Sequence, residues 1–390
     1  MKINPPLLAL AVGAFGIGVT EFSPMGMLPV IANDLGVSIP VAGLLISAYA
    51  FGVLIGAPIM TLLFANMSRR RLLLLSMAIF TVGNFISALA DSYAALMVGR
   101  IITSFNHGAF FGVGAVVATN IVPPDKRAGV VAAMFSGLTI ATVGGVPLAT
   151  LIGETIGWRI AFFGIAVIGV ITMVALRVSL PPLANEGKAD MRAELKVLGK
   201  GPVLAALLLT VVSSSAMFTV FTYIAPILRE ETQASTFFVT SMLVLYGLGL
   251  TVGNILGGRF ADKSLDGTLI ASLLAVAVLL VIFAGTMQSE WMVAPLIFFW
   301  GVASFALVPP LQSMVVQEAA EAPNLASAMN IGAFNLGNAI GAALGGGVIS
   351  MGLGLPAVSL AGAATAVVGL IMLLLIRRGR GGNAVVAEAC

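Results

Sequence analysis

Residues 180–202, with the sequence LPPLANEGKADMRAELKVLGKGP, form the longest polar interruption in an otherwise apolar chain. Seven of the chain's 35 charged residues lie in this stretch. On each side of it the sequence contains six apolar runs, and a run of about 20 residues is what a helix needs to cross the hydrocarbon core of a membrane. The stretch therefore predicts a linker between two bundles of membrane-spanning helices.

The composition supports a membrane protein and excludes several other classes. Of the 390 residues, 59% are hydrophobic and only 9% are charged, whereas soluble globular proteins have about 25% charged residues. A single His and a single Cys cannot form a His/Cys metal site or a disulfide framework, and a net charge of +3 does not indicate nucleic-acid binding. We therefore expect no cofactor, no nucleic-acid partner and no enzymatic activity, and a monomer surrounded by lipid.

Twelve apolar runs define the predicted spans. We expect an N-terminal six-helix bundle over residues 1–179, the linker over 180–202, a C-terminal six-helix bundle over 203–376 and a cytoplasmic tail over 377–390. The spans are 6–31, 41–64, 72–90, 94–121, 128–153, 159–179, 203–228, 236–258, 268–287, 291–316, 325–350 and 355–376.

Positive charges predict the orientation of these spans. If the N-terminus is cytoplasmic, sixteen Lys and Arg residues lie in inside segments, and only Arg159 and Arg229 lie outside. Membrane proteins concentrate positive charge in their cytoplasmic loops. The bias therefore predicts that both termini are cytoplasmic.

The two halves of the sequence repeat. Tyr49 is followed by Gly52 and Gly56, and 197 residues later Tyr246 is followed by Gly249 and Gly253. Glycines four residues apart allow helix backbones to approach closely. An even number of spans in each half makes this a parallel repeat, related by an axis along the membrane normal. We predict an all-α membrane protein with twelve transmembrane helices in two six-helix parallel repeats, which is the architecture of the major facilitator fold.

Three ionisable residues lie firmly within predicted spans, and all three are in the first half: Glu21, Arg100 and His107. A charged side chain at mid-helix costs about 2.5–3.5 kcal/mol on insertion scales, so it usually faces a bundle interior or a cavity. Glu21 and His107 lie at similar depth, and Arg100 lies two turns away on the face of His107. We expect Glu21 to be the proton-coupling group, His107 its partner or relay, and Arg100 a modulator. The alternative is a static network that holds the first and fourth spans together.

The second half offers neutral polar residues for binding a neutral or weakly charged small molecule within apolar walls. Ordinary helix packing is the alternative for each of them. The predicted substrate-binding residues are Thr219, Thr222, Tyr223, Tyr246, Gln312, Asn335 and Asn338.

The stretch from Gly253 to Lys263, which closes the eighth span, contains an acid among basic residues. Such a group can latch adjacent helices through charge-assisted hydrogen bonds. The repeat offset places Ala65 where the second half has Asp262, so the first copy lacks the acid but retains arginines. The predicted gating residues are Gly253, Arg259, Asp262 and Arg70, and the alternative is that the arginines only enforce topology.

Four strings carry a resemblance that covers nearly the whole chain: TEFSPMGMLP at 20–29, NHGAFFG at 106–112, GWR at 157–159 and GAFNLGN at 332–338. The chain resembles the major facilitator superfamily and, within it, the twelve-helix drug:proton antiporter family in its bacterial sugar- and arabinose-efflux branch. In that family Arg100 corresponds to the arginine of the fourth helix. The fifth helix has Gly144, Gly145 and Pro147 but lacks the Gly-Pro pair usual in antiporters.

The resemblance implies a transporter of the bacterial inner membrane that exports small molecules in exchange for protons. The leading interpretation is a proton-coupled exporter of small sugars, metabolites or drugs that works by alternating access. A proton-linked importer is the nearest alternative, because its coupling groups would look alike. A membrane sensor that binds a ligand without transporting it is the alternative from another class.

Overall fold

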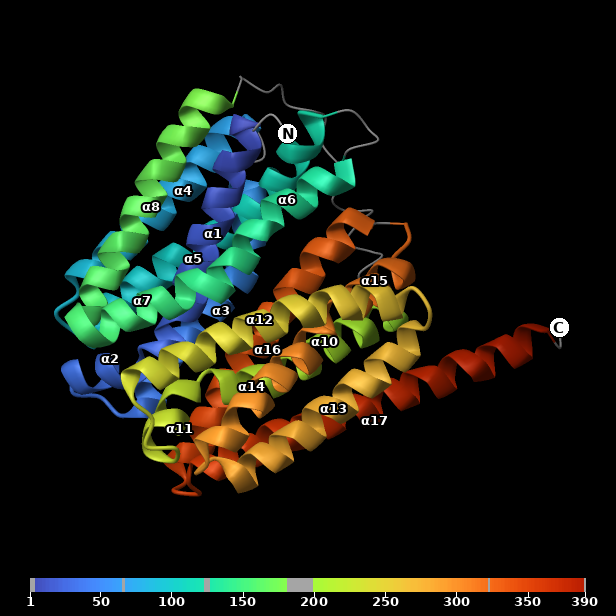
Figure 1. Cartoon of the computed structure of the whole chain (residues 1–390). Coiled ribbons are helices and arrows are strands. Elements are labelled where there is room, and N and C mark those ends of the chain that lie inside the picture. Colours follow the sequence, from blue (N-terminus) through green and yellow to red (C-terminus); the bar gives the residue numbers. More distant parts are fainter. Residues whose placement is uncertain (1–3, 65–66, 123–126, 181–198, 322, 389–390) are drawn as a thin grey trace. The chain divides into compact units, whose positions relative to one another are not determined.

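The computed structural model describes residues 4–64, 67–122, 127–180, 199–321 and 323–388, and nearly all of these residues are helical (Figure 1). Most of the predicted linker therefore lies outside the described residues. Each predicted span coincides with one helix or with consecutive helices, so the predicted all-α class is confirmed.

The first half contains α1 to α8. Their bounds are Pro5–Gly26 (α1), Leu28–Asp34 (α2), Ile39–Leu63 (α3), Arg69–Leu89 (α4), Tyr93–Asn120 (α5), Arg127–Ile140 (α6), Val146–Ile152 (α7) and Trp158–Ser179 (α8). Two π-helical segments, Ala141–Gly145 and Gly153–Gly157, join α6 to α7 and α7 to α8.

The second half contains α10 to α17. Their bounds are Gly201–Phe221 (α10), Ile224–Glu230 (α11), Thr236–Ala261 (α12), Leu265–Thr286 (α13), Glu290–Phe305 (α14), Val308–Glu318 (α15), Pro323–Ser350 (α16) and Leu355–Glu388 (α17).

Ten stretches among the described residues are long and apolar enough to cross a membrane. One of them, Gly129–Ser179, covers two predicted spans. The 28 residues of α16 are not among the ten, because its glycines and asparagines lower its hydropathy.

The first span of each half is broken at the same place. α1 ends at Gly26 and α2 begins at Leu28, and 197 residues after Pro29 of α2 the sequence has Pro226 in α11. Proline is tolerated in the first turn of a helix, where its missing N–H would have no partner. The repeat therefore extends from sequence spacing to the positions of helix breaks.

Contacts between Cα atoms divide the chain into two compact units. The first comprises residues 1–189 and 221–248, and the second comprises 190–220 and 249–390. The predicted bundles follow the sequence repeat rather than these units, and their boundaries stay a prediction. In the first unit α4 packs against α5 and α8, and α1 packs against α6 and α8, around a core that includes Leu10, Ile17, Phe80, Phe110 and Phe162.

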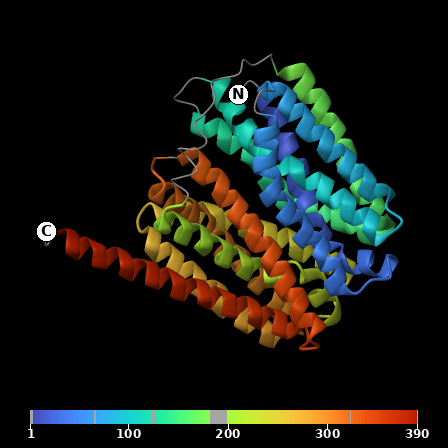
Figure 2. The ribbon, with the colours of Figure 1, turned by 180° about the vertical axis from the view of Figure 1, so that it is seen from behind.

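In the second unit α13 and α17 lie side by side, as both views of the ribbon show (Figures 1 and 2). Arg377 Nε of α17 forms a 3.1 Å ion pair with Asp266 Oδ2 in the first turn of α13. The helix continues to Glu388, beyond the predicted end of the last span at residue 376.

The repeated glycines make equivalent contacts in the two halves. A Cβ at Gly56 of α3 would lie 2.9 Å from the Cα of Phe105 in α5, and a Cβ at Gly253 of α12 would lie 2.9 Å from the Cα of Val302 in α14. Phe105 and Val302 are also 197 residues apart. The close approach of the second and fourth helices of each repeat therefore depends on these small residues.

Candidate functional site

The three ionisable residues predicted within spans lie together inside the first unit. Glu21 belongs to α1, and Arg100 and His107 belong to α5. Their exposed fractions are 4%, 1% and 5% respectively. The predicted juxtaposition of a carboxyl, a guanidinium and an imidazole is therefore present.

A proline in α1 leaves a backbone carbonyl free to accept a hydrogen bond from Arg100. Pro24 lies inside α1 and has no N–H to donate to the carbonyl of Thr20, four residues earlier. Arg100 Nη1 donates to that carbonyl oxygen at 2.6 Å. A buried carbonyl left without a partner would be costly, so the proline and the arginine form one structural feature.

The guanidinium of Arg100 also lies over an aromatic ring. Its Cζ is 4.2 Å from the ring centroid of Tyr49 in α3, a cation–π contact. Two other nitrogens of the guanidinium, Nε and Nη2, are buried and have no hydrogen-bond partner among the described residues. No ion pair within 4 Å joins Arg100 to Glu21, so Arg100 retains donors for another acceptor.

Tyr49, His107 and Glu21 form a row of titratable side chains. The Tyr49 hydroxyl lies 3.3 Å from His107 Nδ1, and the same nitrogen lies 3.8 Å from Glu21 Oε2. The second distance is longer than a hydrogen bond but too short for a bridging water, which would need two hydrogen bonds of about 2.8 Å each. A small movement therefore brings the imidazole and the carboxyl into direct contact.

Polar side chains of α1 and α4 fix the backbone beside Glu21. Thr20 Oγ1 donates to Asn84 Oδ1 at 2.6 Å, and Asn84 Nδ2 donates to the carbonyl of Phe80 at 2.9 Å. Asn106 Nδ2 donates to the carbonyl of Thr103, which leaves Asn106 Oδ1 buried without a partner among the described residues.

Sequence reasoning misses Tyr49 and Asn84 as members of this site. In the sequence Tyr49 serves only as a marker of the repeat, and Asn84 gives no periodic signal. Pro24 signals neither of them; a proline inside a helix identifies only the carbonyl that needs a partner from elsewhere, here that of Thr20, which Arg100 binds.

The predicted substrate-binding residues of the second half do not form one described cluster. Thr219, Gln312, Asn335 and Asn338 belong to the second unit, and Thr222, Tyr223 and Tyr246 belong to the first. All except Gln312 are buried. Their role stays a prediction.

Some of these side chains are engaged and others are not. Gln312 donates to Ser327 Oγ at 2.6 Å and accepts from Asn330 Nδ2 at 2.7 Å, which is a packing role. By contrast, both amide atoms of Asn338 and the hydroxyl of Thr222 are buried without a partner among the described residues. Asn335 Nδ2 donates to the carbonyl of Ile331, and Asn335 Oδ1 is buried without a partner among the described residues.

The predicted gating residues lie at helix ends, except Gly253 in the packed part of α12. Arg259 is in the last turn of α12 and Asp262 follows that helix, both exposed and without an ion pair to another described residue. Arg70, in the first turn of α4, donates to the carbonyl of Arg177 near the end of α8. A cation there complements the C-terminal end of the helix dipole, and the predicted gating role stays a prediction.

Glu154 and Arg159, near the start of α8, each take part in an ion pair. Arg159 Nη1 and Trp158 Nε1 donate to Asp34 Oδ2 at 2.6 and 3.1 Å, and the hydrogen bond from Arg159 is the main reason that the pKa of Asp34 lies below its ordinary value. Arg229 donates to the buried carboxylate of Glu154. The only two Lys or Arg residues predicted outside therefore both bind acids.

Comparisons with known proteins agree with this fold. The model of the Major Facilitator Superfamily matches residues 10–331 and 207–388. The inner membrane transport protein YdhP of Escherichia coli (strain K12) is 55% identical over 380 residues, covering 97% of each chain. A chloramphenicol resistance protein of Streptomyces lividans is 34% identical over 345 residues, covering 86% of this chain and 87% of the relative.

A solved structure, that of a D-xylose-proton symporter, has the same fold. It has a TM-score of 0.78 at 16% identity and covers 95% of this chain and 97% of the symporter. The family match, the high identity to a transport protein and the shared fold lead to one conclusion: the chain belongs to the Major Facilitator Superfamily and is a multi-pass membrane transporter.

Proposed function

We propose that the protein is a proton-coupled secondary transporter of the bacterial inner membrane, that it works by alternating access, and that Glu21 carries the coupled proton. The observation that supports this most is the 3.8 Å approach of Glu21 to His107, with both side chains buried in membrane-spanning helices. A carboxyl and an imidazole in that position exchange a proton with little movement.

The pairing of Arg100 favours proton exchange over a static network. In a static network, the permanent cation would neutralise the nearby carboxylate through a direct ion pair. Arg100 instead binds the Thr20 carbonyl and the Tyr49 ring, and His107 is the one basic side chain among the described residues that comes within 4 Å of the Glu21 carboxylate. The Nε and Nη2 atoms of Arg100, which have no partner among the described residues, would bind the Glu21 carboxylate after it releases its proton.

Export is the proposed direction, and the cargo is a small neutral or amphipathic molecule. A relative is a chloramphenicol resistance protein, which supports including an antibiotic beside sugars among candidate cargoes. The unpartnered amide of Asn338, in the second unit, suits hydrogen bonds to such a cargo. A proton entering from outside would protonate Glu21, and its release inside would be exchanged for cargo moving outward.

The proposal is tested by proton flux in proteoliposomes that contain a pH-sensitive dye. The vesicles receive pentoses, disaccharides, nucleosides, cationic drugs and chloramphenicol in turn, with wild type and Glu21→Gln compared. We expect a cargo-dependent proton signal that is lost in Glu21→Gln, because an amide has the shape of the protonated carboxyl but cannot release a proton.

The matched control is Glu230→Gln, which makes the same change at an exposed residue at the end of α11. It should leave the signal unchanged. A full cargo-dependent signal in Glu21→Gln would refute the role of Glu21. A signal in which proton and cargo move in the same direction would replace export with proton-linked import.

A further inference from the structure

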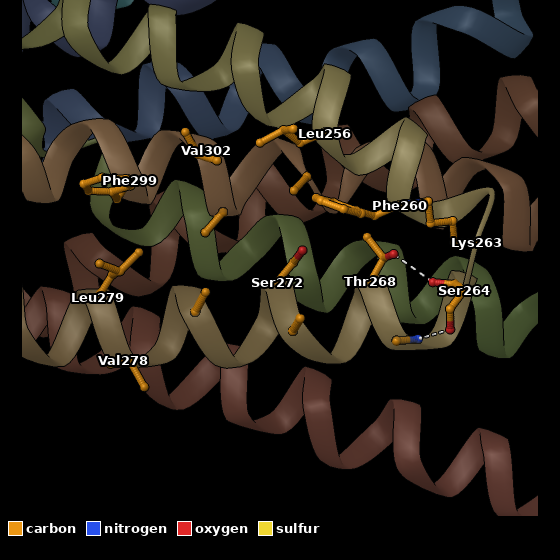
Figure 3. Close-up of a pocket in the computed structure, with 15 residues that line it drawn as sticks. Leu256, Phe260, Lys263, Ser264, Thr268, Ser272, Val278, Leu279, Phe299 and Val302 are labelled. Atoms are coloured by element: carbon orange, nitrogen blue, oxygen red, sulfur yellow. Dashed lines mark hydrogen bonds between the residues drawn. The ribbon is translucent and has the colours of Figure 1, made fainter.

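The second unit contains an elongated apolar groove that the proposed transport site does not use. It has a volume of about 750 Å³ and lies along the end of α12, the first two thirds of α13 and part of α14 (Figure 3). This volume is within the range of about 300–1,000 Å³ that ligand sites occupy. Its walls are formed mainly by Leu256, Phe260, Leu279, Phe299 and Val302.

The polar side chains of the groove gather at one end. Lys263, Ser264 and Thr268 lie together there, whereas Val278, Leu279 and Phe299 lie toward the other end (Figure 3). Ser264 Oγ accepts from Gly267 N at 3.1 Å and Thr268 Oγ1 donates to the Ser264 carbonyl at 2.7 Å. These two hydroxyls therefore serve the start of α13.

At that end, Lys263 has an ammonium group without an acidic partner among the described residues. It is exposed, its Nζ lies 6.0 Å from the ring centroid of Phe260, and no described carboxylate lies within 4 Å of it. Among the nearby acids, Asp266 is paired with Arg377, whereas Asp262 is exposed and forms no ion pair with a described residue; Arg259, three residues earlier, offsets its charge only in the sum. The mouth of the groove therefore has net positive charge.

An apolar groove with a positive charge at one end fits an anionic lipid. Helices α12 and α13 are long and apolar enough to span a membrane, and Phe260, Val278 and Phe299 are each about half exposed, so the groove faces acyl chains. Basic residues at the edge of a membrane span attract anionic headgroups, whereas a sugar would need polar partners along the whole groove. We propose that the groove is a binding site for an anionic glycerophospholipid, with an acyl chain along α13 and α14 and the headgroup phosphate on Lys263.

The test measures lipid binding to the purified full chain in detergent by native mass spectrometry, and it does not depend on transport. Phosphatidylglycerol, phosphatidylcholine and inorganic phosphate are titrated separately. We expect phosphatidylglycerol to bind most tightly, and Lys263→Gln to weaken it about fivefold, as expected for removal of one cation near an anionic lipid. Lys200→Gln, which removes an exposed lysine paired with Glu321, should have no such effect.

A second variant tests the apolar part of the groove. Ala275→Phe places a ring among the lining residues of α13 and should reduce binding of both lipids. Equal retention of phosphatidylglycerol in wild type and Lys263→Gln would overturn the proposal, and so would equal losses in Lys263→Gln and Lys200→Gln. Binding of phosphate alone as tightly as the lipid would also overturn it, because the acyl chain would then contribute nothing.

Discussion

In the first repeat Gly56 of α3 lies against Phe105 of α5, and 197 residues later Gly253 of α12 lies against Val302 of α14. The same offset leads from Glu21, Arg100 and His107 to Phe218, Ile297 and Ser304, of which the first two are apolar and all three are buried. The repeats thus share the small residues that set helix packing and differ in their buried charges. The repeats therefore share a packing scaffold, and the polar residues that we propose to couple protons lie in only one of them.

The largest loss of stability is expected when a carboxylate is introduced in the second repeat at the position equivalent to Glu21. Phe218→Glu places a carboxylate at a fully buried position of α10, where the residues equivalent to Arg100 and His107 cannot support it. Burying that charge costs of order 3 kcal/mol. We expect low yield and a lowered unfolding temperature in detergent, and no recovery of coupling in the double variant with Glu21→Gln.

Recovery of proton-coupled transport in that double variant would mean that the two repeats are chemically interchangeable. Phe218→Leu is the control, since it keeps the position apolar.

Adding one methyl group at equivalent glycines tests the shared scaffold. Gly56→Ala and Gly253→Ala both introduce a Cβ 2.9 Å from the Cα of the facing residue, and the Cβ at Gly253 also meets the Val302 carbonyl oxygen more closely still; each should lower stability by about 1–3 kcal/mol, with the larger loss at Gly253. Thermal unfolding in detergent measures the effect. Gly258→Ala is the matched control in α12, because a Cβ there would meet nothing within 4 Å. A loss at Gly258 as large as that at Gly253 would contradict the packing explanation.

Replacing Arg100 by lysine tests whether the first repeat needs a planar guanidinium. The ammonium of a lysine could reach the Thr20 carbonyl, but it would lack the planar fork of donors and the stacking on Tyr49, a contact worth about 0.5–2 kcal/mol. We expect Arg100→Lys to lower both the unfolding temperature and the rate of coupled transport.

The rate is measured with the proteoliposome assay, and Arg378→Lys at the end of the last span is the control. Unchanged transport by Arg100→Lys would show that only the positive charge matters.

The smallest effect concerns the ion pair of Asp34 with Arg159. The pKa of Asp34 is lowered mainly by the hydrogen bond from Arg159, so the stabilisation is present above the unfolded value of about 3.8 and is lost as the pH falls through the folded value. The side chains of Arg159 and Asp34 are 37% and 45% exposed, which limits the contribution to at most about 1 kcal/mol.

Asp34→Asn should therefore lower the unfolding temperature slightly at pH 7 and have a smaller effect near pH 3. An equal loss at both pH values would attribute the effect to packing rather than to charge.

Much of the fold is predictable because its signals are strong and periodic. Apolar runs long enough to span a bilayer, the Tyr49 and Tyr246 repeat and the linker at 180–202 all predict the architecture. The low hydropathy of α16 shows the limit of this signal. Its length predicts a span, although its glycines and asparagines place it outside the ten apolar stretches.

The site is predictable only in part. Intramembrane charge identifies Glu21, Arg100 and His107, because such residues are costly and therefore rare. Tyr49 and Asn84 escape prediction, since neutral polar residues are common in spans and their partners depend on tertiary packing. The contact of Arg100 with the Thr20 carbonyl likewise requires the structure, although Pro24 signals it in the sequence.

The central claim is that the first repeat carries the coupled proton on Glu21. It is tested most directly by comparing two modes of transport in the Glu21→Gln variant, once a cargo is known. We expect cargo exchange at equal pH to persist, because it needs only the bound cargo and the alternation of access. We expect accumulation driven by a pH gradient to be lost, whereas Glu230→Gln retains both. Gradient-driven accumulation by Glu21→Gln at the wild-type rate would contradict the claim.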